Sequence, residues 1–192
     1  MGNASESTIK GTGVVAGVAY AEAVWVRPRP ALPTEGSIDP EQASDSEYDR
    51  FLAAVDTVAG RLEQRAAAAE GQAAEVLTAT AGMVKDRGWH KAVRKNIRTG
   101  RDAEFATVGA TDKFVTMFEA AGGVMAERTT DLKDVRDRVI AELRGEDEPG
   151  LPLVDGEAVL FADDLAPADT ATLDTKHIKA LVTELGGPTS HT

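Results

Sequence analysis

The 192-residue chain lacks several features, and each absence excludes a class of chemistry or location. It contains no cysteine, which excludes disulfide bonds and thiolate catalysis within this segment and suits a reducing compartment. No run of about 18 apolar residues is present, and residues 1–11 lack the basic start and apolar centre of a signal peptide. We therefore expect a cytoplasmic protein without membrane insertion.

Positive charge and histidine are also scarce. With 21 Lys and Arg against 32 Asp and Glu, the formal net charge of −11 argues against nucleic acid as a partner and suits a basic protein partner. Among the three histidines, His90 and His177 have no Cys, His or carboxylate neighbours at metal-ligand spacing. We expect both to serve the structure or to face solvent, and we expect no metal site in this segment.

The two ends of the chain have strand-like patterns. Residues 9–27 combine β-branched and small residues with glycines, which predicts strands joined by tight turns. The prolines of residues 27–33 cannot sustain a helix or a central strand, so they mark a crossing between domains. Apolar runs at 158–161 and 179–183 predict two further strands, with a short helix over 167–173 between them.

Helical periodicity fills the region between these ends. Apolar residues recur every three or four positions from Asp39 onward, and Asp39 before Pro40 is suited to cap the first helix. Four more helices are expected, over residues 72–85, over 90–97, after a cap at Asp102 and over 125–143. Helices joined by such short loops form a bundle.

The order of these parts predicts one domain inserted into another. The N-terminal strands find possible partners only after residue 150, so the bundle is expected to interrupt a single α/β domain. We place the N-terminal strands in residues 1–32, the inserted helical domain in 33–146 and the remainder of the α/β domain in 147–192.

The most informative stretch is residues 186–192, which read Gly-Gly-Pro-Thr-Ser-His-Thr. Phosphoryl transfer to an imidazole needs a neutral, exposed ring nitrogen, a fixed tautomer and donors for the phosphate oxygens. The two glycines let the backbone approach a bulky anion, and Thr189 and Ser190 are suited to cap a helix that begins near His191. These residues favour a phosphate-carrying histidine at His191; the alternative is an ordinary glycine-rich turn.

Residues 185–192 resemble the phosphohistidine signature of enzyme I of the sugar phosphotransferase system, pyruvate phosphate dikinase and phosphoenolpyruvate synthase. Residues 11–19 and 126–135 are similar to enzyme I in particular, to its opening strand and to the Glu-Arg-x-x-Asp helix of its carrier-binding domain. The Ala-, Asp- and Arg-rich composition is typical of high-GC Gram-positive bacteria. The resemblance implies an α/β swivelling phosphohistidine domain, incomplete at its C-terminus, with an inserted all-α helical bundle that binds the carrier protein HPr.

The resemblance also implies roles for individual residues. His191 would accept the phosphoryl group on Nε2 and pass it to HPr, and Thr170 would hydrogen-bond the phosphohistidine ring. Thr189 and Ser190 would orient the loop or donate to phosphate, and Arg128 would engage the transferring group near the HPr interface. The apolar patch covered by HPr would be formed by Leu77, Met83 and Val84.

Taken together, the resemblance implies phosphoryl transfer from phosphoenolpyruvate through His191 to HPr, the first step of the sugar phosphotransferase system. Phosphoenolpyruvate and Mg²⁺ would bind a barrel domain outside this chain, and the chain itself would hold no cofactor. We expect this segment to be monomeric and the full-length protein to be a dimer. Two alternatives stand: an HPr-docking module without a competent histidine site, and a fragment of a pyruvate phosphate dikinase-like enzyme. The lack of a nucleotide-binding domain before His191 disfavours the second.

Overall fold

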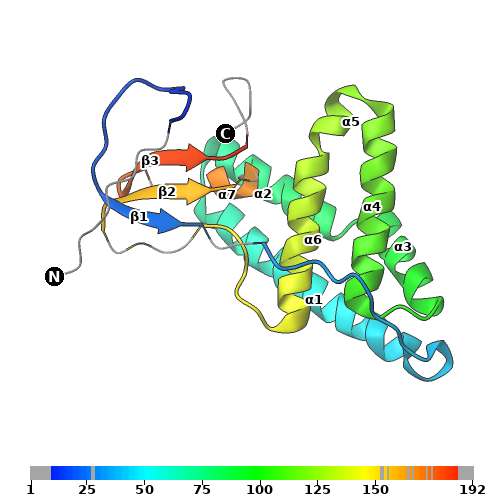
Figure 1. Ribbon diagram of the computed structural model, residues 1–192. Helices are drawn as coiled ribbons and strands as arrows, with labels where there is room; N and C mark the ends of the chain where they lie inside the picture. The colour runs from blue at the N-terminus through cyan, green and yellow to red at the C-terminus, as the bar shows by residue number, and fades with distance from the viewer. Residues whose placement is uncertain are drawn as a thin grey trace.

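The computed structural model describes residues 10–26, 29–151, 154, 156–163, 165, 167–171, 173 and 175–185. Helices gather into a bundle on one side, and a small parallel sheet lies on the other (Figure 1). This arrangement confirms the expected fold class, in which a helical bundle is combined with an α/β part. Within the described ranges, no helix is both long enough and apolar enough to cross a membrane.

The bundle consists of α1 (Pro40–Ala68), α2 (Gly71–Val84), α3 (Arg87–Arg98), α4 (Ala103–Ala121), α5 (Gly123–Glu127) and α6 (Thr129–Arg144). Its core is mostly aliphatic, and its large aromatic members are Phe51 and Trp89, whose ring centroids lie 5.4 Å apart. The indole Nε1 of Trp89 donates to Thr111 Oγ1 at 3.1 Å, so this buried polar group has a partner.

Aspartate side chains begin three of the helices. Asp39 precedes α1, and its carboxylate accepts a hydrogen bond from a backbone N–H of the first turn. Asp86 accepts from the Trp89 N–H at 2.7 Å to start α3, and Asp102 accepts from the Phe105 N–H at 2.8 Å to start α4. Such caps satisfy donors that have no partner inside the helix. The predicted caps at Asp39 and Asp102 are confirmed.

The expected single helix over residues 125–143 is wrong, because the chain divides there into α5 and α6. Arg128 is the residue between them, and its N–H bonds to the Met125 carbonyl, as in a tight final turn. The Thr129 hydroxyl donates to the Ala126 carbonyl at 2.8 Å and so competes with the regular helical ladder. Met125, which lies in α5 before the break, is exposed to solvent.

The sheet joins distant parts of the chain. Its order is β1 (Glu22–Trp25), β2 (Ala158–Ala162) and β3 (Ile178–Thr183), all parallel, and α7 (Pro167–Thr170) lies between β2 and β3 in sequence. The expectation that the N-terminal strand pairs with strands after residue 150 is therefore confirmed. In β2, Ala158, Leu160 and Ala162 are buried and alternate with half-buried residues, as a pleated strand requires.

The N-terminal region contains less strand than expected. Residues 9–27 were predicted to hold strands joined by turns, but β1 is the only strand within residues 10–26. Before β1, the apolar side chains of Val14, Val15, Val18 and Tyr20 are exposed. β-propensity alone does not make a strand without a neighbour for its backbone groups, and β2 already pairs with β1 and β3.

A buried arginine joins the bundle to the segment that carries α7. Arg138 on α6 donates through Nε to Asp134 Oδ2 at 2.7 Å and through Nη2 to Asp169 Oδ1 at 2.5 Å. Its Nη1 contacts Glu148, which also accepts two hydrogen bonds from Arg65 of α1, at 2.9 and 2.8 Å. The Arg138 side chain is only 1% exposed, so these carboxylates replace the water that its charge would otherwise need.

The same cluster changes the acidity of its members. Burial alone would lower the pKa of Arg138, but Asp134 and Asp169 raise it above the usual value, so the guanidinium stays charged. Burial alone would raise the pKa of Glu148, but Arg138 and Arg65 hold it below the usual value. Arg138 and Glu148 therefore remain ionised together at neutral pH.

Two further carboxyl groups show the opposing effects of burial and pairing. On α4, Glu104 accepts hydrogen bonds from Arg144 Nε and Arg50 Nη2, both at 2.8 Å; these arginines outweigh burial and lower its pKa. On α6, burial raises the pKa of Asp137, although Arg136 Nε donates to its Oδ1 at 2.8 Å. Glu104 thus ties α1, α4 and α6 together through charge.

We expect Arg138→Met to lower the free energy of unfolding by about 3–5 kcal/mol, because buried carboxylates lose their cation while the unbranched stem is kept. Arg61→Met is the matched control, since the Arg61 pair with Glu142 is largely solvated and contributes about 0–1 kcal/mol. Urea unfolding followed by circular dichroism measures both variants. Equal losses in the two would contradict the role given to Arg138.

Candidate functional site

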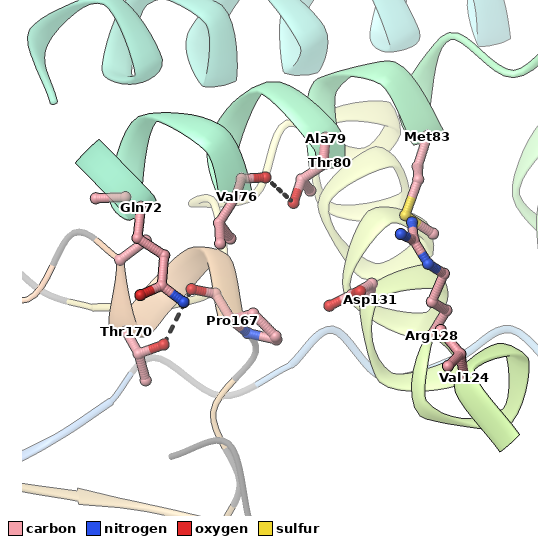
Figure 2. A pocket seen from close by; sticks show the side chains of 12 residues that line it. Gln72, Val76, Ala79, Thr80, Met83, Val124, Arg128, Asp131, Pro167 and Thr170 are labelled. Atoms are coloured by element: carbon pink, nitrogen blue, oxygen red, sulfur yellow. Dashed lines mark hydrogen bonds between the residues drawn. The ribbon is translucent and has the colours of Figure 1, made fainter. Parts of the chain in front are cut away.

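A pocket of about 590 Å³ lies where the bundle meets the segment that carries α7. One wall is α2, another is the junction of α5 and α6, and the third is α7. Figure 2 shows the two ends of this pocket. Gln72 lies near Pro167 and Thr170 at one end, and Met83 lies beside Arg128 at the other.

The α2 wall follows from helical spacing. Gln72, Val76, Thr80 and Met83 recur at steps of three or four residues, so they share one face of the helix. The Thr80 hydroxyl donates to the Val76 carbonyl at 3.0 Å. This wall therefore offers mainly apolar surface, with the Gln72 amide as its polar group at the α7 end.

Arg128 supplies an exposed cation on the opposite wall. It lies between α5 and α6, and Asp131 lines the pocket one turn further along the chain. Within the described part of the chain, the Arg128 guanidinium forms no ion pair. A guanidinium presents N–H donors in a planar fork that matches phosphate oxygens. Arg128 is therefore equipped to bind an anionic group that enters the pocket.

Thr170 ends α7 and is half-buried. Its Oγ1 donates to the Pro167 carbonyl at 3.0 Å, which fixes the hydroxyl hydrogen and leaves the oxygen lone pairs for another donor. The preceding residue, Asp169, is bonded to Arg138. The buried arginine on α6 thus positions α7, and with it the Thr170 hydroxyl, at the pocket.

The structure brings together three of the residues singled out from the sequence. Thr170, Arg128 and Met83 line the same pocket, although they come from α7, the α5–α6 junction and α2. His191 and its neighbours Thr189 and Ser190 lie outside the described residues.

Two residues expected in the exposed apolar patch do not belong to a surface. Leu77 and Val84 on α2 have 0% exposure and pack in the bundle core. Met83, the third member, is half-exposed at the pocket. The correction has a simple physical reason, because Leu77 and Val84 lie on the face of α2 that the bundle buries.

The two other histidines have no part in the pocket. His90 Nε2 lies 2.8 Å from the Val84 carbonyl, and its ring packs edge-on against Phe51 with centroids 5.4 Å apart. This confirms the structural role expected for His90, and His177 is exposed. No three His, Cys, Asp or Glu side chains converge on a metal-sized site within the described ranges.

Sequence reasoning missed part of the lining. Gln72, Thr80, Val124 and Asp131 face the pocket but were not singled out. Helical spacing from Met83 could have found the two α2 residues, and the three-residue step from Arg128 could have found Asp131. Val124 could not have been found in this way, because the break at Arg128 was not predicted.

Comparisons with known protein families cover most of the chain. Residues 10–128 match the family described as PEP-utilising enzyme, N-terminal. Residues 154–192 match the family described as PEP-utilising enzyme, mobile domain. The second match includes α7, β3 and the C-terminal histidine motif.

Individual relatives agree with these matches. The phosphoenolpyruvate-protein phosphotransferase of Streptomyces coelicolor is 41% identical over 97% of this chain, and that of Bacillus subtilis is 32% identical over 95%. The chain spans about a third (33%) of the length of these curated relatives.

Solved structures give the same picture. An enzyme I structure determined by NMR matches with a TM-score of 0.76 and 25% identity, over 93% of this chain and 74% of that one. An N-terminal domain of enzyme 1–nitrogen shares the fold with a TM-score of 0.61 and 21% identity, over the same shares of the two chains.

We expect Leu77→Ala to lower the free energy of unfolding by about 2–5 kcal/mol, because it opens a cavity in the core. Met83→Ala, on the exposed side of the same helix, should cost clearly less. Chemical denaturation of the two variants tests the distinction between core and pocket. A larger loss for Met83→Ala would contradict the division of α2 into these two faces.

Proposed function

Because the chain belongs to the family of phosphoenolpyruvate-utilising enzymes, we propose that it forms the HPr-facing N-terminal part of a phosphoenolpyruvate-protein phosphotransferase. In this proposal, His191 carries a phosphoryl group between phosphoenolpyruvate and HPr. The proposal includes a cytoplasmic location, a monomeric segment within a dimeric full-length protein, and phosphoenolpyruvate and Mg²⁺ sites in a further domain. We assign no residue of this chain to Mg²⁺, and no step below uses it.

One observation carries the proposal: Arg128 and Thr170 come from distant segments and line one pocket. One offers a cation for phosphate oxygens, and the other offers an acceptor for an imidazole N–H. A phosphohistidine needs both. The motif at residues 186–192 follows β3 closely in sequence.

The transfer consists of two displacements at phosphorus. In the first, the bond to the enol oxygen of phosphoenolpyruvate breaks, a bond to His191 Nε2 forms, and the released enolate takes a proton to become pyruvate. In the second, the bond between Nε2 and phosphorus breaks and a new bond forms to the active histidine of HPr. The first displacement uses the neutral imidazole of His191, and the second restores it while using the imidazole of HPr. Phosphorus keeps its oxidation state throughout, so no oxidant or reductant is required.

Thr170 would act by fixing the histidine tautomer. Nε2 can attack only if its lone pair is free, which requires the ring proton on Nδ1. The Thr170 hydrogen is already donated to the Pro167 carbonyl, so Thr170 Oγ1 is available to accept the Nδ1–H. Thr189 and Ser190 would orient the loop or donate to the phosphate oxygens.

Arg128 would act on the transferring group itself. Phosphoryl transfer is accelerated mainly by positioning and by stabilising the charge on the equatorial oxygens. The exposed Arg128 guanidinium could reach those oxygens when HPr closes the pocket, and Met83 beside it would give HPr an apolar contact.

The first prediction concerns the phosphohistidine. Incubation of this chain with phosphorylated HPr should produce an acid-labile phosphoryl adduct, seen by intact-mass analysis, because the second half-reaction is reversible and needs only HPr and residues of this chain. His191→Ala should give no adduct. If the parent chain binds HPr but forms no adduct, the chain is an HPr-docking module and not a competent segment of the enzyme.

The second prediction concerns the two pocket residues. Thr170→Val should slow adduct formation about 10-fold, the size of one lost hydrogen bond, and Arg128→Gln should slow it by about 10-fold or more, because it removes charge stabilisation. Thr116→Val and Arg61→Gln remove a matching hydroxyl and arginine outside the pocket, on α4 and α1. Quench-flow measurement with phosphorylated HPr gives the rates, and equal slowing in the controls would argue against both roles.

A further inference from the structure

Sulfur chemistry in this chain is limited to methionine. The sequence contains four methionines and no cysteine, so a peroxide that attacks sulfur here attacks a thioether. The structure describes three of the four: Met83 on α2, Met117 on α4 and Met125 on α5. Met117 and Met125 are exposed and Met83 is half-exposed, so a small oxidant reaches all three.

These three methionines differ in their surroundings. Met83 lines the pocket, at the end that it shares with Arg128, whereas Met117 and Met125 are not among the lining residues. Oxidation converts an apolar thioether into a sulfoxide, which is polar and chiral. On the exposed surfaces of α4 and α5, this change meets water. At Met83, it places a new polar oxygen in the mainly apolar α2 wall of the pocket.

The end of α2 holds Met83 in this place. Met83 is the penultimate residue of the helix, and its carbonyl accepts a hydrogen bond from the Asp86 N–H at 3.1 Å. The next residue, Val84, is fully buried in the bundle core, whereas Met83 packs only partly against that core. A change at the Met83 sulfur is therefore presented to the pocket while the helix stays anchored.

Arg128 is a partner for a sulfoxide at this position. Figure 2 shows the Met83 sulfur next to the Arg128 guanidinium, and both residues line the pocket. A thioether sulfur is a weak acceptor, so it leaves the guanidinium N–H donors free for other oxygens. A sulfoxide oxygen carries a large partial negative charge and accepts hydrogen bonds strongly. It therefore competes with a phosphate oxygen for the same donors.

We propose that Met83 is a redox-sensitive modification site: its oxidation by hydrogen peroxide places a sulfoxide oxygen on the Arg128 guanidinium and slows phosphoryl transfer through the pocket. This inference rests on the proposed function, because it takes Arg128 to act on the transferring group. It adds regulation of that site by an oxidant. Methionine sulfoxide reductases reverse the modification, with one enzyme for each sulfoxide epimer.

The oxidation is a two-electron oxygen transfer. A lone pair on Met83 Sδ attacks one oxygen of hydrogen peroxide, the O–O bond breaks and an S–O bond forms. The proton on the transferred oxygen passes to the leaving hydroxide, which departs as water. Sulfur is oxidised and peroxide is reduced by the same two electrons, so no other reagent takes part.

The test compares the chain before and after treatment with hydrogen peroxide, which is removed before phosphorylated HPr is added. Peptide mass mapping should find one added oxygen at each of Met83, Met117 and Met125. Quench-flow measurement should then show adduct formation on His191 slowed about 10-fold, as expected when Arg128 no longer stabilises the transferring group. Treatment with the two methionine sulfoxide reductases should restore the rate.

Two variants separate Met83 from the other methionines. Met83→Leu keeps an apolar side chain of similar size without sulfur, so peroxide should not slow it relative to its own untreated rate. Met117→Leu combined with Met125→Leu removes the two exposed sulfurs and should remain as sensitive as the parent chain. The reverse pattern would overturn the inference. So would a Met83 that stays unoxidised when Met117 and Met125 are oxidised.

An Arg128→Gln background tests how the sulfoxide acts. If it acts by occupying the guanidinium, peroxide should slow this already slow variant by less than about 2-fold. A further loss of about 10-fold would instead indicate a lost apolar contact with HPr, and would overturn the role given to Arg128.

The same experiment separates this inference from the proposed function. If the untreated parent chain forms an adduct but oxidation at Met83 does not slow it, the inference fails and the proposed function stands. If the untreated parent chain forms no adduct, both fail. Circular dichroism should show that the treated chain is still folded, and loss of the fold would also overturn the inference.

Discussion

Arg138 makes contacts with carboxylates from three places in the chain: Asp134 within α6, Glu148 after it and Asp169 in α7. A guanidinium with 1% of its side chain exposed has lost its hydration, and these carboxylates replace the water that its charge would otherwise need. The cluster therefore sets the position of the chain just after the bundle. The pocket exists because this position brings α7 against α2.

The pocket divides its chemistry between two structural parts. The α/β side, through α7, holds a hydroxyl next to a buried ion cluster, whereas the bundle side presents the exposed charge of Arg128. This division suits a chemical group that is bound on the α7 side of the pocket and transferred to a partner on the bundle side.

Local sequence signals predicted where most helices lie, but not how the helices pack against one another. Asp39 and Asp102 identified helix starts because capping depends on residues within one turn. Periodicity could not say which side of α2 faces the core, so Leu77 and Val84 were assigned to a surface they do not reach. Arg128 and Thr170 were found through family resemblance alone, since nothing local links two residues whose meeting depends on the buried Arg138 cluster.

The pairing of β1 with β2 has a consequence for the order of synthesis. β1 at residues 22–25 leaves the ribosome long before its partner at residues 158–162, and the whole bundle is made in between. The helices, whose contacts are mostly between neighbours in sequence, can collapse while β1 waits without a strand to pair with. The sheet therefore cannot form until the bundle has been made, and until then the backbone groups of β1 are open to chaperones and to wrong partners.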